Sequence, residues 1–261
     1  MKRMVSRMSG RGIRVACAVA ALSTLLAGSA MAQSTLFNIP STDTVSNGKG
    51  YFEIDFLPQA PVEEGSARIF IYNPRFIAGL PHDVEVGLNF PIYHSSDFAD
   101  PSSFVYIQPN IKWKFYNNDD MGLAASVGTV VNVPLNARDG QLSWAYIYGN
   151  ISKKIKAANG ARVTAGPYGV IAKQDDPFAV GFLGTRGGIL LGYEQPLSGP
   201  VSFVADWFSS KNSLGYFTPG ISVTLPHSGL LNIGYSFGND SWDDLNAPNN
   251  RFVFVYYGVT F

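Results

Sequence analysis

Cysteine is almost absent from this sequence, which holds a single one, Cys17, among its 261 residues. One cysteine cannot form an intrachain disulfide, so a disulfide-held scaffold is excluded. The only histidines are His82, His94 and His227, and none has a Cys or a second His at the spacing of a metal site. No glycine-rich phosphate loop lies between a strand and a helix pattern either. The sequence therefore predicts no bound metal and no cofactor.

Apolar runs long enough to cross a membrane as a helix, about 20 residues, are missing as well. Residues 1–14 hold five basic residues and no acid, and the apolar stretch 15–30 that follows is too short for a span. Ala30 and Ala32 then flank Met31 in the small-x-small pattern that a signal peptidase accepts. We expect residues 1–32 to be a cleaved secretory signal peptide, which would also remove Cys17.

Positive charge is scarce in what remains. Beyond residue 32 there are 14 basic residues against 19 acidic ones, a net charge of −5. A mildly acidic surface argues against a nucleic-acid partner and against a polybasic membrane patch.

A strand pattern is what the sequence does have. In residues 52–56 Phe, Ile and Phe alternate with Glu and Asp, and the same period of two returns along the chain. No helical stripe competes with it. We expect twelve strands, at 51–58, 66–78, 84–93, 103–116, 122–134, 142–155, 162–172, 186–196, 201–209, 214–225, 230–238 and 251–261.

The connections between these strands alternate between short and long, as in "GLPHD" against "KQDDPFAVGFLGT". Outer-membrane barrels alternate in this way, with tight periplasmic turns and longer outer loops. We therefore expect an all-β, transmembrane, antiparallel up-and-down barrel of about twelve strands over residues 50–261. Residues 33–49 would be a periplasmic segment and the protein a monomer. A secreted β-sandwich is the alternative fold, but it gives no reason for the alternation of connection lengths.

The charges of the expected strands lie opposite the more apolar face. A lipid-facing Arg or Lys at mid-bilayer costs about 2–4 kcal/mol, so these side chains should point into the lumen. They could form a charge-selective aqueous path, or they could pair into a network that closes the barrel. The candidate lumen-lining residues are Glu53, Asp55, Arg68, Glu85, Lys112, Lys114, Glu194 and Asp206.

The last strand ends on an aromatic residue, Phe261, with Val259 and Tyr257 at the alternate positions before it. This ending resembles the C-terminal targeting signal of outer-membrane proteins, which their assembly machinery reads. The resemblance gives Phe261 a role in biogenesis. It also implies that the partners are the assembly machinery and the lipids of the outer membrane.

Two stretches, 79–93 ("GLPHDVEVGLNFPIY") and 205–225, resemble a broad outer-membrane family grouped with the phenol-degradation meta-pathway. The resemblance implies a barrel that takes up small, hydrophobic or aromatic compounds, and it supplies no catalytic residues. Pro109, Pro167 and Pro219 fall in the middle of expected strands, where each removes one ladder donor.

The function expected from these features is an outer-membrane channel or transporter for small solutes, not an enzyme. A first alternative is a closed structural barrel whose outer loops bind a partner. A second is a lipid hydrolase in which His94 activates the hydroxyl of Ser95 or Ser96.

Overall fold

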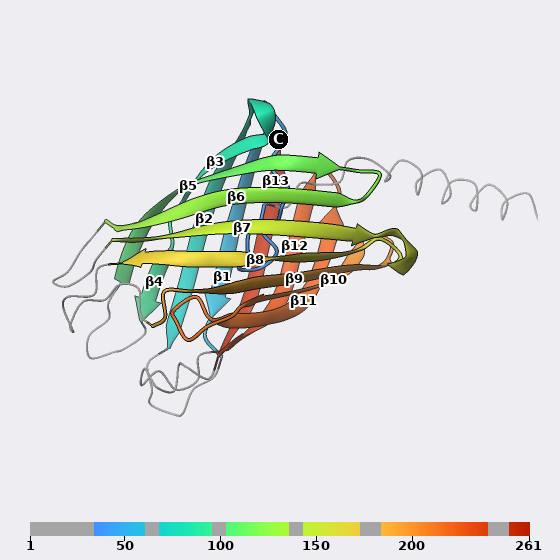
Figure 1. Cartoon of the computed structure of the whole chain (residues 1–261). Helices are drawn as coiled ribbons and strands as arrows, with labels where there is room; N and C mark the ends of the chain where they lie inside the picture. The colour runs from blue at the N-terminus through green and yellow to red at the C-terminus, as the bar shows by residue number, and fades with distance from the viewer. Residues whose placement is uncertain (1–33, 61–67, 96–102, 136–142, 173–183, 240–250) are drawn as a thin grey trace, which may run out of the picture. The chain divides into compact units, whose positions relative to one another are not determined.

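A computed structural model describes residues 34–60, 68–95, 103–135, 143–172, 184–239 and 251–261. Within these ranges the chain is built from strands, joined in two places by a single 3₁₀ turn (Figure 1). The elements are β1 Gly50–Pro58, β2 Ile69–Leu80, η1 Pro81–Asp83, β3 Val84–Asn89, β4 Ile92–Ser95, β5 Ser103–Asn118, β6 Leu123–Pro134, β7 Trp144–Ile155, η2 Lys156–Ala158, β8 Ala161–Ala172, β9 Gly187–Ser198, β10 Val201–Phe208, β11 Tyr216–Leu225, β12 Gly229–Gly238 and β13 Arg251–Thr260.

These strands form one antiparallel sheet that closes on itself. Strands that follow one another in sequence pair, except β3 and β4, and β1 pairs with both β2 and β13. β3 and β4 count as one strand of the wall, because both pair with β2 on one side and β5 on the other, with a break at Phe90 and Pro91. The protein is therefore a closed barrel of twelve antiparallel strands, as the sequence predicts, and the β-sandwich is wrong.

The closure joins the two ends of the barrel sequence. Tyr51 pairs with Thr260, and the register continues to Phe56 opposite Val255. Beyond it, the backbones of Gly50 and Phe261 exchange two hydrogen bonds of 2.9 Å. A Cβ atom at Gly50 would lie 2.5 Å from the ring of Phe261, so the glycine makes room for this ring at the seam. The last residue is thus part of the closure.

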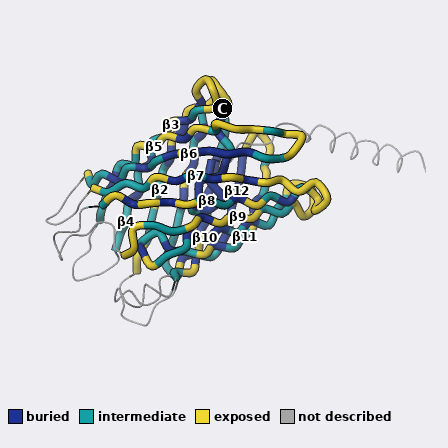
Figure 2. Tube along the Cα trace, in the orientation of Figure 1, coloured by how far each residue is buried: buried dark blue, intermediate teal, exposed yellow. Residues whose placement is uncertain are grey.

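The two faces of the sheet differ in polarity, and buried and exposed residues alternate along the strands (Figure 2). Large apolar side chains stand exposed on the outer face, for example Ile151 at 59% and Ile171 at 65%. The buried inner positions include many carboxylates, amides and hydroxyls beside aromatic and apolar side chains. A soluble protein has the opposite distribution, so this wall is suited to a surrounding of lipid.

The short connections lie at one end of the barrel, together with Gly50 and Phe261. Two of them place consecutive non-glycine residues in the left-handed region, His82 and Asp83 in one and His227 and Ser228 in the other. Short polar residues tolerate this conformation better than branched apolar ones. Two of the three histidines therefore lie in tight turns. In the described ranges, no helix has the length and apolarity that a membrane span requires.

The three mid-strand prolines are accommodated by one-sided gaps in the ladder. Pro109 pairs with Leu88 of β3, Pro167 with Ile189 of β9, and Pro219 with Ala205 of β10. On the opposite side, towards β6, β7 and β12 respectively, the pairing skips the proline. An antiparallel residue donates to only one neighbour, so each proline removes one bond and the strand continues in register.

Residues 34–45 belong to the stretch 33–49, for which the sequence predicts a periplasmic segment. Most of them are buried, and Leu36, Ile39, Ser41 and Thr42 are 0% exposed. The blue N-terminal trace runs inside the ring of strands (Figure 1). Residues 46–49 are exposed at the short-turn end. We call residues 34–45 the plug segment.

The polarity of the outer face generates a testable prediction. Replacing Ile233, an exposed residue at the middle of β12, with Arg should reduce the free energy of unfolding by about 2–4 kcal/mol, because the charge would face the centre of the bilayer. Urea unfolding of the protein inserted in lipid vesicles measures the change. The matched control is Ile155→Arg at the end of β7, where the cost should be at most about 1 kcal/mol. Equal costs at both positions would contradict the orientation of the wall.

Candidate functional site: the lumen and its plug segment

The inner wall of the barrel is unusually polar for a protein interior. Burying such groups is costly unless they are hydrogen-bonded, so each needs a partner. The buried polar side chains that the strands turn inward include Glu53, Asp55, Arg75, Glu85, Asn89, Lys112, Ser126, Asn132, Asn150, Ser152, Thr164, Asp206, Thr218, Asn232 and Ser236.

The plug segment supplies many of these partners. It folds into a tight turn of its own, in which Thr35 bridges Pro40 and the Leu36 N–H donates to the Ile39 carbonyl at 2.9 Å. The Ser41 N–H also donates to the Ser34 carbonyl at 3.0 Å. Among the described residues, no strand of the wall pairs with this turn, so side-chain contacts with the wall position it.

The tip of the turn is bound by one carboxylate. Oδ2 of Asp206, on β10, accepts hydrogen bonds from the backbone N–H groups of Phe37, Asn38 and Ile39, at 2.9 Å from the first and the last. The Asn38 amide donates to the other oxygen of Asp206 at 3.2 Å and to Thr218 Oγ1 at 2.7 Å. Three successive N–H groups converge on one anion, which is a strong arrangement for a buried carboxylate.

The two ends of the plug segment meet at a second carboxylate, Glu85 of β3. Glu85 Oε1 accepts from Ser34 Oγ at 2.5 Å, and Oε2 accepts from the Val45 N–H at 2.8 Å. Lys112, which faces Glu85 from β5, lies 2.9 Å from its carboxylate and donates to the Ser34 carbonyl at 2.9 Å. Both side chains of the Glu85–Lys112 pair are buried. Because Glu85 bonds Ser34 and Val45, the pair joins the two ends of the plug segment.

A third charged contact holds the segment near the short-turn end. Arg162 of β8 forms an ion pair with Glu194, its register partner on β9, and donates to Asp43 of the plug segment. The Arg162 side chain is 18% exposed and Asp43 is 31% exposed. This contact is therefore more screened by solvent than the Glu85–Lys112 pair.

Apolar contacts with the wall also hold the tip of the turn in the plug segment. The Phe37 ring lies 5.4 Å from that of Phe254 and 6.2 Å from that of Tyr256, both on β13. A Cβ atom at Gly234 would lie 2.8 Å from the Phe37 ring, and one at Gly192 would lie 2.7 Å from Leu36. The strands thus use glycine where the plug segment comes closest.

Arg75, on β2, was not among the candidates from the sequence. It is buried, forms an ion pair with Glu53, and donates to Thr35 Oγ1 of the plug segment at 2.9 Å. Tyr51 donates to the same Glu53, and Asn73 donates to Asp55 at 2.8 Å. Arg75 has the same strand parity as Ile77 and could have been found by extending the period of two along β2.

The eight lumen candidates fall into different environments. Glu53, Asp55, Glu85, Lys112 and Asp206 are buried inside the barrel, and each makes a protein contact.

The other three candidates lie towards the ends of the barrel. Glu194 is half-buried beside Arg162, and Lys114 lies 3.7 Å from Asp83 near the short turns. Arg68 lies one residue before β2, is exposed, and has the parity of the outward-facing Tyr72, so the structure does not group it with the inner set.

His94 is paired differently from the sequence expectation. Its Nδ1 lies 2.9 Å from Ser103 Oγ, across the β4–β5 pairing. Ser96, one of the two expected nucleophiles, lies outside the described residues. Among the residues that the structure describes, no group of three or more His, Cys, Asp or Glu could hold a metal ion.

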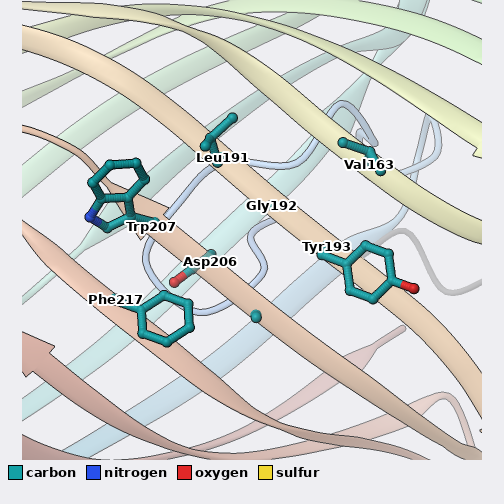
Figure 3. A pocket seen from close by; sticks show the side chains of 8 residues that line it. Val163, Leu191, Gly192, Tyr193, Asp206, Trp207 and Phe217 are labelled. Carbon is teal, nitrogen blue, oxygen red and sulfur yellow. The ribbon is translucent and has the colours of Figure 1, made fainter.

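The outer face of the same wall carries an apolar hollow of about 460 Å³ (Figure 3). Leu191, Tyr193, Trp207 and Phe217 stand around it, and Figure 3 places Asp206 beside it, near the blue plug segment. The hollow opens outward between exposed apolar side chains, and the inward-facing Gly192 and Asp206 lie at its floor.

Comparison with known proteins gives structural likeness without sequence likeness. No protein-family model matches the chain, and no curated protein matches it in sequence. The COG4313 outer membrane channel from Pseudomonas putida F1 is similar in structure, with a TM-score of 0.58 and 10% identity, over 88% of this chain and 99% of that one.

Two further solved structures are more distant. The translocator domain of the autotransporter NalP from Neisseria meningitidis has a TM-score of 0.40 and 12% identity, over 96% of this chain and 95% of that one. A mutant of the Rh. blastica porin has a TM-score of 0.33 and 9% identity, over 82% and 99%. At these identities the likeness to the channel shows the fold, an outer-membrane type of β-barrel.

The double contact of Glu85 with both ends of the plug segment generates a prediction. Glu85→Gln should raise about tenfold the fraction of molecules in which the plug segment has left its contacts in the lumen. The amide would present a donor to the Val45 N–H, and a hydrogen bond to a charged group contributes about 1.5–3 kcal/mol. Ion-current recording should show more frequent large openings. Asp55→Asn is the control, since Asp55 is equally buried but bonds Asn73. A change confined to ion selectivity would contradict this role.

Proposed function

We propose that the protein is an outer-membrane channel for small solutes, with a lumen that the plug segment narrows. The observation that carries the proposal is the polar inner wall, which is filled by a separate segment through side-chain contacts. A barrel built only as a scaffold could fill its interior with its own wall side chains. The likeness to an outer membrane channel supports the same function.

Export and insertion are part of this proposal. Residues 1–32 would be removed after Ala32, with Ala30 as the other small residue of the cleavage pattern. The assembly machinery would read Phe261, Val259 and Tyr257. Support comes from the outward exposure of Tyr257 and Phe261, at 44% and 69%, beside the closing seam. The protein would act as a monomer among outer-membrane lipids, since the barrel closes within one chain.

Small hydrophobic or aromatic compounds are the solutes that the lumen favours. Buried rings line it beyond the plug segment, towards the end opposite the short turns. Phe208 of β10 lies 5.1 Å from the Tyr168 ring and 6.1 Å from the Tyr146 ring. Aromatic rings bind one another edge to face at such distances. The resemblance to the phenol-degradation group points to the same solute class.

A closed barrel with partner-binding outer loops is the competing function. The filled lumen also suits it, and most of the longer connections lie outside the described residues. A measurement of ion conduction distinguishes the channel from the closed barrel. A lipid hydrolase has one observation in its favour, the 2.9 Å contact of His94 with Ser103, which is the reach of a base to a nucleophile. Ser103→Ala would abolish lipid hydrolysis in that case.

The channel function predicts discrete current steps in a planar bilayer. Deleting residues 34–45 should increase the single-channel conductance severalfold, because the plug segment lies within the lumen. The control is Ile54→Leu on the outer face, which leaves the lumen unchanged. A folded barrel that is silent both with and without residues 34–45 would contradict the channel and favour the closed barrel.

The solute class predicts block of the current by small aromatic alcohols. Benzyl alcohol should interrupt the ion current at concentrations several times lower than an aliphatic alcohol of the same size, because it can stack in the aromatic part of the lumen. Tyr146→Leu should reduce this difference, while Tyr72→Leu on the outer face should leave it unchanged. Equal block by both alcohols would contradict an aromatic preference.

A further inference from the structure

The apolar hollow in the outer wall interrupts a surface of large side chains. The four large residues around it are each 37–44% exposed, and Ala205 is the small outward-facing residue of β10 among them: they are Leu191, Tyr193, Trp207 and Phe217 (Figure 3). Its volume of about 460 Å³ lies within the range of about 300–1,000 Å³ that is common for ligand sites. The wall therefore has room for an apolar group from outside the barrel.

The hollow runs obliquely across four strands, from β8 to β11. It begins at Val163, the third residue of β8 from the short-turn end, and reaches Phe217, the second residue of β11 from the opposite end. Neighbouring strands are about 4.8 Å apart, so the hollow extends about 14 Å across them. This elongated course suits a lipid acyl chain, which is also the apolar group that surrounds an outer-membrane wall.

A positive charge lies on the same outer face, beside the short-turn end of the hollow. Lys153 of β7 has the outward parity of Ile151 and is exposed. It pairs with Val163, which in turn pairs with Tyr193. The Tyr193 hydroxyl donates to Gln195, two residues closer to the short turns, at 2.8 Å. The polar groups of this region are thus at the end where a lipid headgroup would lie.

Lys153 and its neighbour Lys156 keep hydrogen-bonding capacity for an anion. They donate to the main-chain carbonyls of Met121 and Asp120 respectively, and each ammonium has three donors. In the described ranges, no carboxylate lies within ion-pair distance of either lysine. The chain beyond residue 32 is acidic overall, so these two lysines are a local feature and not part of a basic surface.

We propose that the hollow binds one acyl chain of an anionic phospholipid from the leaflet at the short-turn end, with Lys153 and Lys156 contacting its phosphate. The inference depends on the lipid-facing wall and holds whether or not the lumen conducts. Asp206, which binds the tip of the plug segment, lies at the floor of the hollow. The bound lipid would therefore pack against the outer side of the wall that holds the plug segment.

Quenching of tryptophan fluorescence by brominated lipids tests the site. A full-chain variant with Trp113→Phe, Trp144→Phe and Trp242→Phe keeps Trp207 beside the hollow. The matched control lacks all four tryptophans and carries Phe76→Trp, at an exposed position of the outer face on β2, across the barrel. Both are reconstituted in phosphatidylcholine vesicles with added brominated phosphatidylglycerol. The binding constant of phosphatidylglycerol relative to phosphatidylcholine should be about fivefold higher at Trp207 than at residue 76, as expected for one lysine near an anionic lipid.

Substitutions in the Trp207 variant identify the contacts. Lys153→Gln combined with Lys156→Gln should reduce the preference for phosphatidylglycerol to that of the control, because the phosphate loses its cations. Ala205→Phe should reduce it as well, because the ring fills the hollow. Each variant is measured as the folded barrel. The proposal is overturned if both lipids quench Trp207 alike, if residue 76 shows the same preference, or if the preference survives either substitution.

A last variant distinguishes the two leaflets. Arg186→Gln combined with Lys211→Gln removes two exposed cations near the other ends of β9 and β10. The preference at Trp207 should be unchanged in this variant. Its loss there would assign the hollow to a lipid of the opposite leaflet and would overturn the proposal.

Discussion

The hydrogen-bonded closure of β1 against β13 is the constraint on which the rest of the structure depends. A sheet in lipid cannot leave an edge unpaired, because the bilayer core offers no water to its backbone groups. Closing the sheet creates an inside, and the period of two then divides every strand into a lipid face and a lumen face. The polar lumen face in turn requires partners. The plug segment supplies many of these partners, and Asp206 and Glu85 are its two main attachment points.

The fold could be predicted because its signals are local. Alternation, turn residues and connection lengths are properties of neighbouring residues, and they suffice for twelve strands. The break within the third expected strand is also local, at Phe90 and Pro91. The mid-strand prolines cast doubt on the strand register. They are tolerated because each proline lacks one N–H donor and so disrupts the ladder towards one neighbouring strand only.

The lumen was harder to predict because it depends on contacts between distant residues. The parity of Glu85, Lys112 and Asp206 predicts that they face the lumen, and the structure buries all three in contact with the plug segment. Their partners are 40 to 169 residues away in sequence, in a segment with no period that looks like a polar linker. The sequence of residues 34–45 carries no local signal of burial, because these residues are buried only by the surrounding barrel. The carboxylates that suggested an ion-selective path therefore accept hydrogen bonds from main-chain N–H groups and hydroxyls of the plug segment.

The plug segment also has a particular mechanical position. It precedes β1, leaves the barrel past exposed residues 46–49, and shares no ladder hydrogen bond with the strands of the wall. A pull on this connection from the short-turn end would act on the side-chain contacts of Glu85, Arg162 and Asp206 and not on a backbone ladder. The wall and its filling are thus two elements of one chain that are held together by different kinds of bond.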